Sequence, residues 1–155
     1  MQTLLSGITV GGRRLTDTDQ VLAIDQAHSR LIEMVKTGDF TLASSTACEI
    51  QSIVARGEAL SLGRFRDGMV YINGTDYTPP PAQVLDIHWT NGMKEILHIV
   101  SPILRAMACF LWMSREQFFY DGNKRTARLI ANGILLDHGY PELLIRASDQ
   151  LEYNT

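Results

Sequence analysis

The stretch that decides the fold of this chain is QFFYDGNKRTAR, residues 117–128. It places Gly122 directly before a run of helix-forming residues, and apolar segments flank it on both sides. A glycine at such a junction permits a sharp turn, and the backbone N–H groups after it then face outward from the beginning of a helix. We therefore predict a turn that joins two apolar helices and carries an anion-binding helix end.

Charged side chains strengthen this predicted anion site. Lys124, Arg125 and Arg128 follow one another at the three- and four-residue spacing that brings side chains toward one helical face. Cations in a first helical turn oppose the helix dipole, so their presence favours a phosphate-binding role. Asp121 supplies an oxygen of the type that Mg²⁺ prefers, and Asn123 can donate to a phosphate oxygen. The pattern predicts a triphosphate–Mg²⁺ cradle, and a capped turn with solvated basic side chains is the alternative.

Helical periodicity continues on both sides of this loop. The predicted helices cover about residues 18–37, 45–56, 83–100, 102–114 and 123–138. Gly38, Gly57 and Gly139 stand where the predicted helices end, and Pro102 suits a first helical turn. A last helix is expected to begin near Ser148. The fold class is therefore predicted to be all-α.

The interval at residues 63–81 breaks the helical pattern. Residues 69–72 form a short β-type run, and the Asn73-Gly74 pair that follows is a strong hairpin signal. Three prolines at residues 79–81 prevent further strand pairing. We predict a β-hairpin that serves as a flap, and a plain connecting loop is the alternative, because a lone hairpin is marginally stable.

Length, charge and cysteine content limit the possible classes of protein. The 155 residues suit one domain, residues 1–155. Fourteen basic against 17 acidic residues give a net charge of −3, which disfavours nucleic acid and anionic membranes as partners. Cys48 and Cys109 cannot form a disulfide framework, and reduced thiols point to the cytoplasm. Residues 1–10 lack the basic region of a signal peptide, and we expect no membrane span.

Residues 117–128 resemble the signature of the Fic/Doc (Fido) family, which is commonly written H-P-F-x-[D/E]-G-N-[G/K]-R-x-x-R. The matching residues are Phe119, Asp121, Gly122, Asn123, Lys124, Arg125 and Arg128. Residues 63–80 are similar to the family's flap, and residues 131–141 to its following helix and turn. The resemblance implies the Fic fold, a helical bundle with a β-hairpin flap. It also implies transfer of AMP from ATP to a hydroxyl of a target protein.

The resemblance assigns a role to each matching residue. Asp121 would hold Mg²⁺, and Gly122 with its two following residues, Asn123 and Lys124, would line the anion hole. Arg125 and Arg128 would contact the nucleotide phosphates, and both, with Asn123, belong to the implied catalytic set.

The flap would bind the target protein as an added strand. Its expected contact residues are Ile72, Gly74, Thr75 and Tyr77. A separate regulatory partner, or no regulation, is expected rather than an internal inhibitory helix at residues 45–49. The sequence predicts neither the target nor the oligomeric state.

The head of the signature departs from the family pattern. Gln117 stands at the position of the general-base histidine, and Phe118 replaces the usual proline. An amide has no titratable group near pH 7, and general-base assistance contributes about 10²–10⁴ in rate. We therefore expect weak or altered AMP transfer. Two alternatives stay open: a catalytically silent module that binds a protein through its flap, and a Doc-like phosphotransferase, since Lys124 is typical of Doc proteins.

Overall fold

The computed structural model describes residues 15–144, and these residues form a helical bundle. The elements in chain order are α2 (Leu15–Thr37), α3 (Ser44–Val54), the 3₁₀ helix η1 (Ala82–Val84), α4 (Leu85–Leu97), α5 (Pro102–Glu116) and α6 (Asn123–Asp137). The all-α prediction is confirmed for these residues. The helix expected near Ser148 lies outside them.

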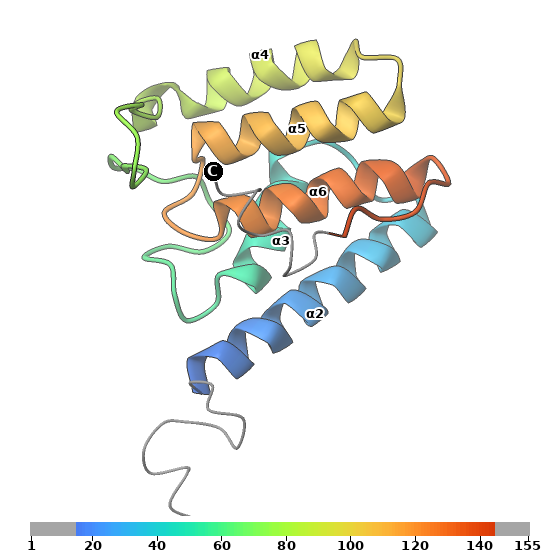
Figure 1. Cartoon of the computed structure of the whole chain (residues 1–155), viewed down its shortest axis with the longest axis horizontal. Coiled ribbons are helices and arrows are strands. Elements are labelled where there is room, and N and C mark those ends of the chain that lie inside the picture. The colour runs from blue at the N-terminus through green and yellow to red at the C-terminus, as the bar shows by residue number, and fades with distance from the viewer. Residues whose placement is uncertain (1–14, 145–155) are drawn as a thin grey trace, which may run out of the picture.

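Helix α6 occupies the centre of the bundle. It packs against α5 on one side and against α2 and α3 on the other, while α4 covers the far side of α5 (Figure 1). Most of α6 is buried, and its apolar residues point in all directions around the axis, as expected of a central helix. The beginning of α6 is therefore held from several sides.

Local sequence explains where the two central helices begin and end. Pro102 occupies the first turn of α5, and the Ser101 hydroxyl caps it by accepting a hydrogen bond from the Leu104 N–H at 3.4 Å. After α6, Gly139 adopts φ +76°, and the Tyr140 N–H returns to the Leu135 carbonyl at 2.9 Å. These are the features of a glycine-terminated helix.

The predicted β-hairpin at residues 63–81 is wrong in its pairing. Residues 63–81 contain no strand, although the chain does turn at Asn73 and Gly74, where Gly74 has φ +82°. An isolated two-stranded ladder is marginal in water, and contacts with the helices hold this segment instead. Residues 63–81, called the flap segment below, lie at the end of the bundle where α5 turns into α6 (Figure 1).

An aromatic cluster fills the core beside that turn. Phe118 is fully buried, and its ring centroid lies 5.0 Å from each of those of Phe65, Trp89 and Trp112. The cluster joins the flap segment, α4 and α5 to the α5–α6 loop. Among the described residues, no helix is both long and apolar enough to cross a membrane.

Candidate functional site

Two residues in left-handed conformations form the turn between α5 and α6. Gln117 ends α5 with φ +51°, and Gly122 precedes α6 with φ +76°. Gln117 is the only residue other than glycine with positive φ in the described part of the chain. The turn presents the first N–H groups of α6, which have no intrahelical acceptors, toward the flap segment.

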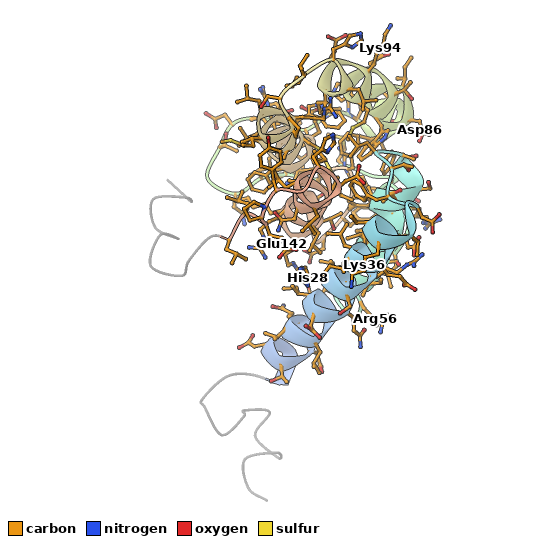
Figure 2. All side chains as sticks on the ribbon, turned by 90° about the vertical axis from the view of Figure 1, so that its right-hand side faces the viewer. His28, Lys36, Arg56, Asp86, Lys94 and Glu142 are labelled. Atoms are coloured by element: carbon orange, nitrogen blue, oxygen red, sulfur yellow. The ribbon has the colours of Figure 1, made fainter. Side chains whose placement is uncertain are left out.

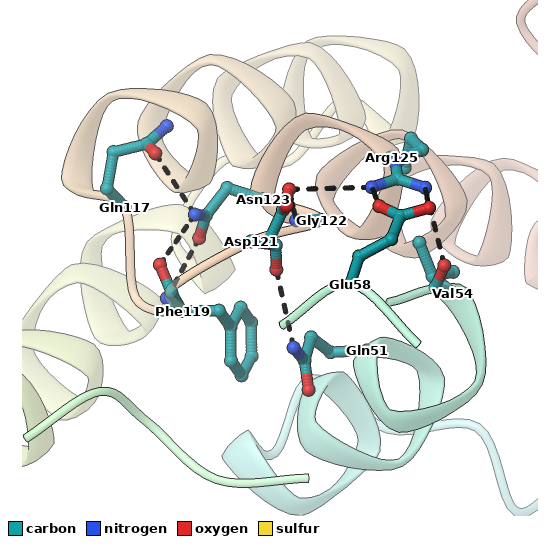
Figure 3. Close-up of polar contacts among 9 residues, drawn as sticks. All are labelled: Gln51, Val54, Glu58, Gln117, Phe119, Asp121, Gly122, Asn123 and Arg125. Atoms are coloured by element: carbon teal, nitrogen blue, oxygen red, sulfur yellow. Dashed lines mark hydrogen bonds and ion pairs between the residues drawn. The ribbon is translucent and has the colours of Figure 1, made fainter. Parts of the chain in front are cut away.

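Asn123 closes this loop with its side chain. Its Oδ1 accepts from the Phe119 N–H at 2.9 Å, and its Nδ2 donates to the Phe119 carbonyl at 2.7 Å (Figure 3). Asn123 is 7% exposed. The expected side-chain donation from Asn123 to a phosphate is therefore not what this arrangement offers, because the amide is already bonded within the loop.

The Gln117 side chain is held at both ends of its amide. Its Oε1 accepts from Asn123 Nδ2 at 3.0 Å (Figure 3), and its Nε2 donates to the Ser114 carbonyl at 2.6 Å. An amide cannot take a proton near pH 7, but it can orient a hydroxyl by hydrogen bonding. Residue 117 is thus a positioned polar group rather than a base.

Arg125 is paired with a carboxylate that sequence reasoning missed. Its Nη2 lies 2.5 Å from Glu58 Oε2 and its Nη1 lies 3.3 Å from Glu58 Oε1, an end-on, two-contact arrangement (Figure 3). Asp121 Oδ1 lies 3.5 Å from the same guanidinium. Glu58 is 67 residues away in sequence, so no local pattern signals this contact.

One pocket of about 310 Å³ combines the loop with the flap segment. Its walls include the predicted residues Gln117, Ile72 and the run from Asp121 to Arg125. Tyr71, Asn73 and Tyr120 complete it. The structure therefore brings together most of the residues that the sequence proposed as a phosphate site.

Arg128 lies elsewhere, in a second pocket of about 440 Å³ between α2, α6 and residues 142–144. His28 and Glu142 also line this pocket, and their side chains meet at 2.5 Å (Figure 2 labels both). Arg125 and Arg128 thus line different pockets, and their joint contact with a phosphate stays a prediction.

The predicted contact residues of the flap segment differ in their surroundings. Gly74 and Thr75 are exposed at the turn. Tyr77 is half-buried, its hydroxyl donates to Glu116 Oε1 at 3.4 Å, and the Arg115 guanidinium lies 4.4 Å from its ring centre. Burial, and then the nearby Glu116 carboxylate, raise the pKa of Tyr77. Tyr77 therefore fastens the flap segment to the end of α5.

Two further contacts missed from the sequence join the flap segment to the loop. The Tyr120 hydroxyl donates to Asp67 Oδ1 at 2.5 Å, a hydrogen bond that raises the pKa of Tyr120 and lowers that of Asp67. Arg66 is buried at 2% exposure and bonds to the Gln117 carbonyl at 2.6 Å. No local sequence signal marks either contact.

Comparison with known proteins places this geometry in a family. Residues 24–135 match the model of the Fic/DOC family. The chain is 29% identical over 156 residues to protein adenylyltransferase Fic of Nematostella vectensis, covering 94% of this chain and 35% of that protein. It is 25% identical over 158 residues to protein adenylyltransferase fic-1 of Caenorhabditis elegans, covering 97% and 30%. The chain thus spans about a third of the length of these relatives.

Solved structures share the fold. Fic-1 from Caenorhabditis elegans matches with a TM-score of 0.76 at 25% identity, covering 98% of this chain and 46% of that one. A Fic domain containing signaling protein from Bacteroides thetaiotaomicron matches with a TM-score of 0.78 at 21% identity, covering 98% and 60%. The second likeness concerns the fold alone.

Proposed function

This chain belongs to the Fic/DOC family, and from that premise we propose that it binds ATP with Mg²⁺ between α6 and the flap segment. The proposed chemistry is transfer of AMP to a hydroxyl of a target protein, at a rate lowered by Gln117. Relatives named protein adenylyltransferase support this class of reaction.

The observation that carries the proposal is the pocket at the beginning of α6. A helix beginning favours anions through its free N–H groups and its dipole. Here that helix end opens into the same pocket as the side chains of Lys124 and Arg125 and the residues Tyr71–Asn73 of the flap segment. A nucleotide phosphate and a protein segment bound at the flap would therefore meet in one place.

Asp121 is suited to hold Mg²⁺ together with the phosphates. Its side chain is 52% exposed, and Oδ1 accepts from the Gly122 N–H at 2.6 Å. Magnesium sites in nucleotide enzymes use one or two carboxylates and keep waters and phosphate oxygens as the remaining ligands. The described residues contain no group of three or more carboxylate, histidine or cysteine ligands, so the proposed ion would depend on the nucleotide. When bound, Mg²⁺ would neutralise phosphate charge.

The residues of this chain would act mainly by positioning. The α6 N–H groups and Lys124 would bind phosphate oxygens, and Gln117 would orient the target hydroxyl by a hydrogen bond. Proximity and preorganised charge account for large rate factors without acid–base chemistry. Without a proton acceptor at residue 117, the rate of AMP transfer would be lower by a factor of about 10²–10⁴.

Labelled ATP tests the proposal directly. The wild-type chain and Gln117→His are incubated with Mg²⁺, lysate proteins and ATP labelled on the α-phosphate, and parallel reactions use a γ-phosphate label. We expect α-label transfer, faster in Gln117→His by about 10²–10⁴. Transfer of the γ-label instead would indicate phosphotransfer.

Equilibrium binding isolates the nucleotide step. Mg–ATP affinity is expected to fall about 10- to 150-fold in Arg125→Ala, since a charged phosphate contact is worth roughly 1.5–3 kcal/mol. Arg56→Ala is the matched control, because Arg56 is exposed and its guanidinium donates to Gln26 Oε1 at 3.3 Å, outside the proposed pocket. If the wild-type chain binds no Mg–ATP, or if Arg125→Ala binds as well as wild type, the proposed cradle is wrong.

A catalytically silent, protein-binding module is the second candidate. The observation that favours it is the Gln117 amide, whose two ends are already bonded to Ser114 and Asn123. Label transfer only after Gln117→His would support this candidate, whereas transfer by wild type would exclude it.

A further inference from the structure

Arg66 has surroundings that are unusual for a charged side chain. It is 2% exposed, and three of its nitrogens each donate to a backbone carbonyl. Nε reaches Gln117 O at 2.6 Å, Nη1 reaches Gly68 O at 2.8 Å, and Nη2 reaches Pro80 O at 2.5 Å. Its own N–H donates to Phe118 O at 2.9 Å.

No carboxylate of the described residues forms an ion pair with this guanidinium. Burial lowers the pKa of Arg66, and carrying a charge inside a protein costs several kcal/mol without good partners. The rigid, planar guanidinium can donate hydrogen bonds to three backbone carbonyls at once. Arg66 therefore holds three separate stretches of backbone together, although burying its charge costs folding free energy.

Those three pieces are two stretches of the flap segment, at Gly68 and Pro80, and Gln117, which directly follows α5. Gly68 and Pro80 stand before and after the turn of the flap segment, and Gln117 stands at the head of the α5–α6 loop. The Tyr120–Asp67 hydrogen bond reinforces the same junction. Tyr120 also leaves no room at Gly68, where a Cβ would lie 2.7 Å from the Tyr120 hydroxyl.

The bond to the Gln117 carbonyl matters most, because Gln117 has the left-handed backbone that L-residues rarely adopt. A hydrogen bond at 2.6 Å fixes the plane of the peptide after Gln117. Because the peptide plane is fixed, the Gln117 backbone is fixed too, and with it the starting direction of the Gln117 side chain, which lines the pocket. The side chain itself then reaches Ser114 and Asn123.

We propose that Arg66 is a positioning residue, which sets the direction of side chain 117 and holds the flap segment across the pocket from it. It acts through the Gln117 carbonyl and touches neither nucleotide nor target. The functional meaning of this inference depends on the proposed transfer reaction, but the geometric part does not.

Nuclear magnetic resonance of the Gln117 side-chain amide tests the geometric part without any activity. In the ¹⁵N-labelled full chain, this signal pair is assigned by its loss in Gln117→His. We expect Arg66→Lys to move the pair toward the shifts of an unstructured glutamine, while α6 amides keep their shifts. A lysine keeps the charge but lacks the planar fork.

Arg105 provides the matched control. Its Nε and Nη2 also donate to backbone carbonyls, those of Ile99 and Leu97, at 3.0 and 3.5 Å, in the α4–α5 connection. Arg105→Lys is expected to leave the Gln117 amide signals in place. Unchanged Gln117 signals in a folded Arg66→Lys chain would overturn the proposal. A second variant, Arg66→Gln, keeps a hydrogen-bond donor without the charge. If both Arg66→Lys and Arg66→Gln fail to fold, the proposed positioning role is likewise overturned.

Kinetics test the functional part in the Gln117→His background. Adding Arg66→Lys should lower kcat for AMP transfer about 10- to 100-fold, because small misplacements of a reacting group are this costly. The KM for ATP should change little, since the proposed phosphate contacts, the α6 N–H groups and Lys124, do not involve Arg66. A raised KM with unchanged kcat would contradict positioning. If Gln117→His alone transfers nothing, the proposed function fails while the amide measurement still decides the role of Arg66.

Discussion

Phe118 stands where the family signature carries proline, and the structure gives it a packing role. Its ring is completely buried within the cluster of Phe65, Trp89 and Trp112. Truncation would leave a cavity that this cluster cannot fill. Phe118→Ala should lower the free energy of unfolding by about 3–5 kcal/mol, measured by urea denaturation. Leu111→Ala, at a residue 61% exposed on α5, should change it by less than about 0.5 kcal/mol.

Glu58 would compete with a bound phosphate for Arg125. The two side chains are 21% and 23% exposed and meet in two contacts. An ion pair of this partly exposed kind is worth about 1 kcal/mol, so a nucleotide that binds Arg125 must replace it. Glu58→Gln should raise the affinity for Mg–ATP about fivefold, measured by calorimetry.

The control for Glu58 is a carboxylate in a similar ion pair far from the pocket. Glu49 pairs with Arg30 at 2.6 Å between α2 and α3. Glu49→Gln should leave nucleotide affinity unchanged. An equal or weaker affinity in Glu58→Gln would show that Arg125 is not a phosphate ligand.

At the scale of elements, Gly122 sets the point where α6 begins. It adopts φ +76°, and an added Cβ would lie 3.1 Å from the Ala55 Cβ. Gly139, at the other end of α6, has the same φ with nothing within 4 Å. Gly139→Ala should cost about 1–2 kcal/mol for the left-handed backbone, and Gly122→Ala about 1 kcal/mol more for the crowding. Thermal unfolding measures both, and equal losses would rule out the crowding effect.

The helices were predictable because their signals are local. Pro102 and Gly139 mark helix ends within a few residues of themselves, so the bounds of α5 and α6 followed closely. The hairpin prediction relied on an equally local signal, the Asn73-Gly74 pair. It correctly placed the turn but not the pairing, because strand pairing depends on what else holds the segment. In this chain Arg66 and Tyr77 hold it.

For the candidate site, too, local signals predicted some features and could not predict others. The family resemblance, read from residues 117–128, is confirmed by the family match, and the residues from Asp121 to Arg125 do share a pocket. Asn123 and Arg128 were assigned to phosphate by their spacing and side-chain chemistry and by the family resemblance. Spacing could not show that the Asn123 amide closes the loop or that Arg128 lies toward α2. The roles of Asn123 and Arg128 toward a nucleotide remain predictions. Measuring the affinity of Arg128→Ala for Mg–ATP would test the role of Arg128.

At the scale of the whole molecule, the two thiols make stability depend on pH. Burial raises the pKa of Cys109 to about 12, and burial, then Asp86, raise that of Cys48 to about 11. In the unfolded chain a thiol ionises near about 8.5. Between these values the unfolded state holds fewer protons, so stability should fall as pH rises from about 8.5.

Thiol labelling with a disulfide reagent at pH 8 checks this expectation. Neither cysteine should react appreciably in the folded chain, and both should react in urea, because only the thiolate is nucleophilic. Cys109→Ala should make the alkaline loss of stability shallower. Rapid native labelling of Cys109 would contradict the buried environment.

The hydrogen-bonded setting of Gln117 has a genetic consequence. Glutamine and histidine codons differ only at their third base, so a single transversion would introduce an imidazole here. The left-handed backbone, the Ser114 carbonyl and the Asn123 amide would already be in place to receive it. In mutational distance, the chain therefore lies one base change from a titratable group at residue 117. A selection for gain of AMP transfer should return this codon change first.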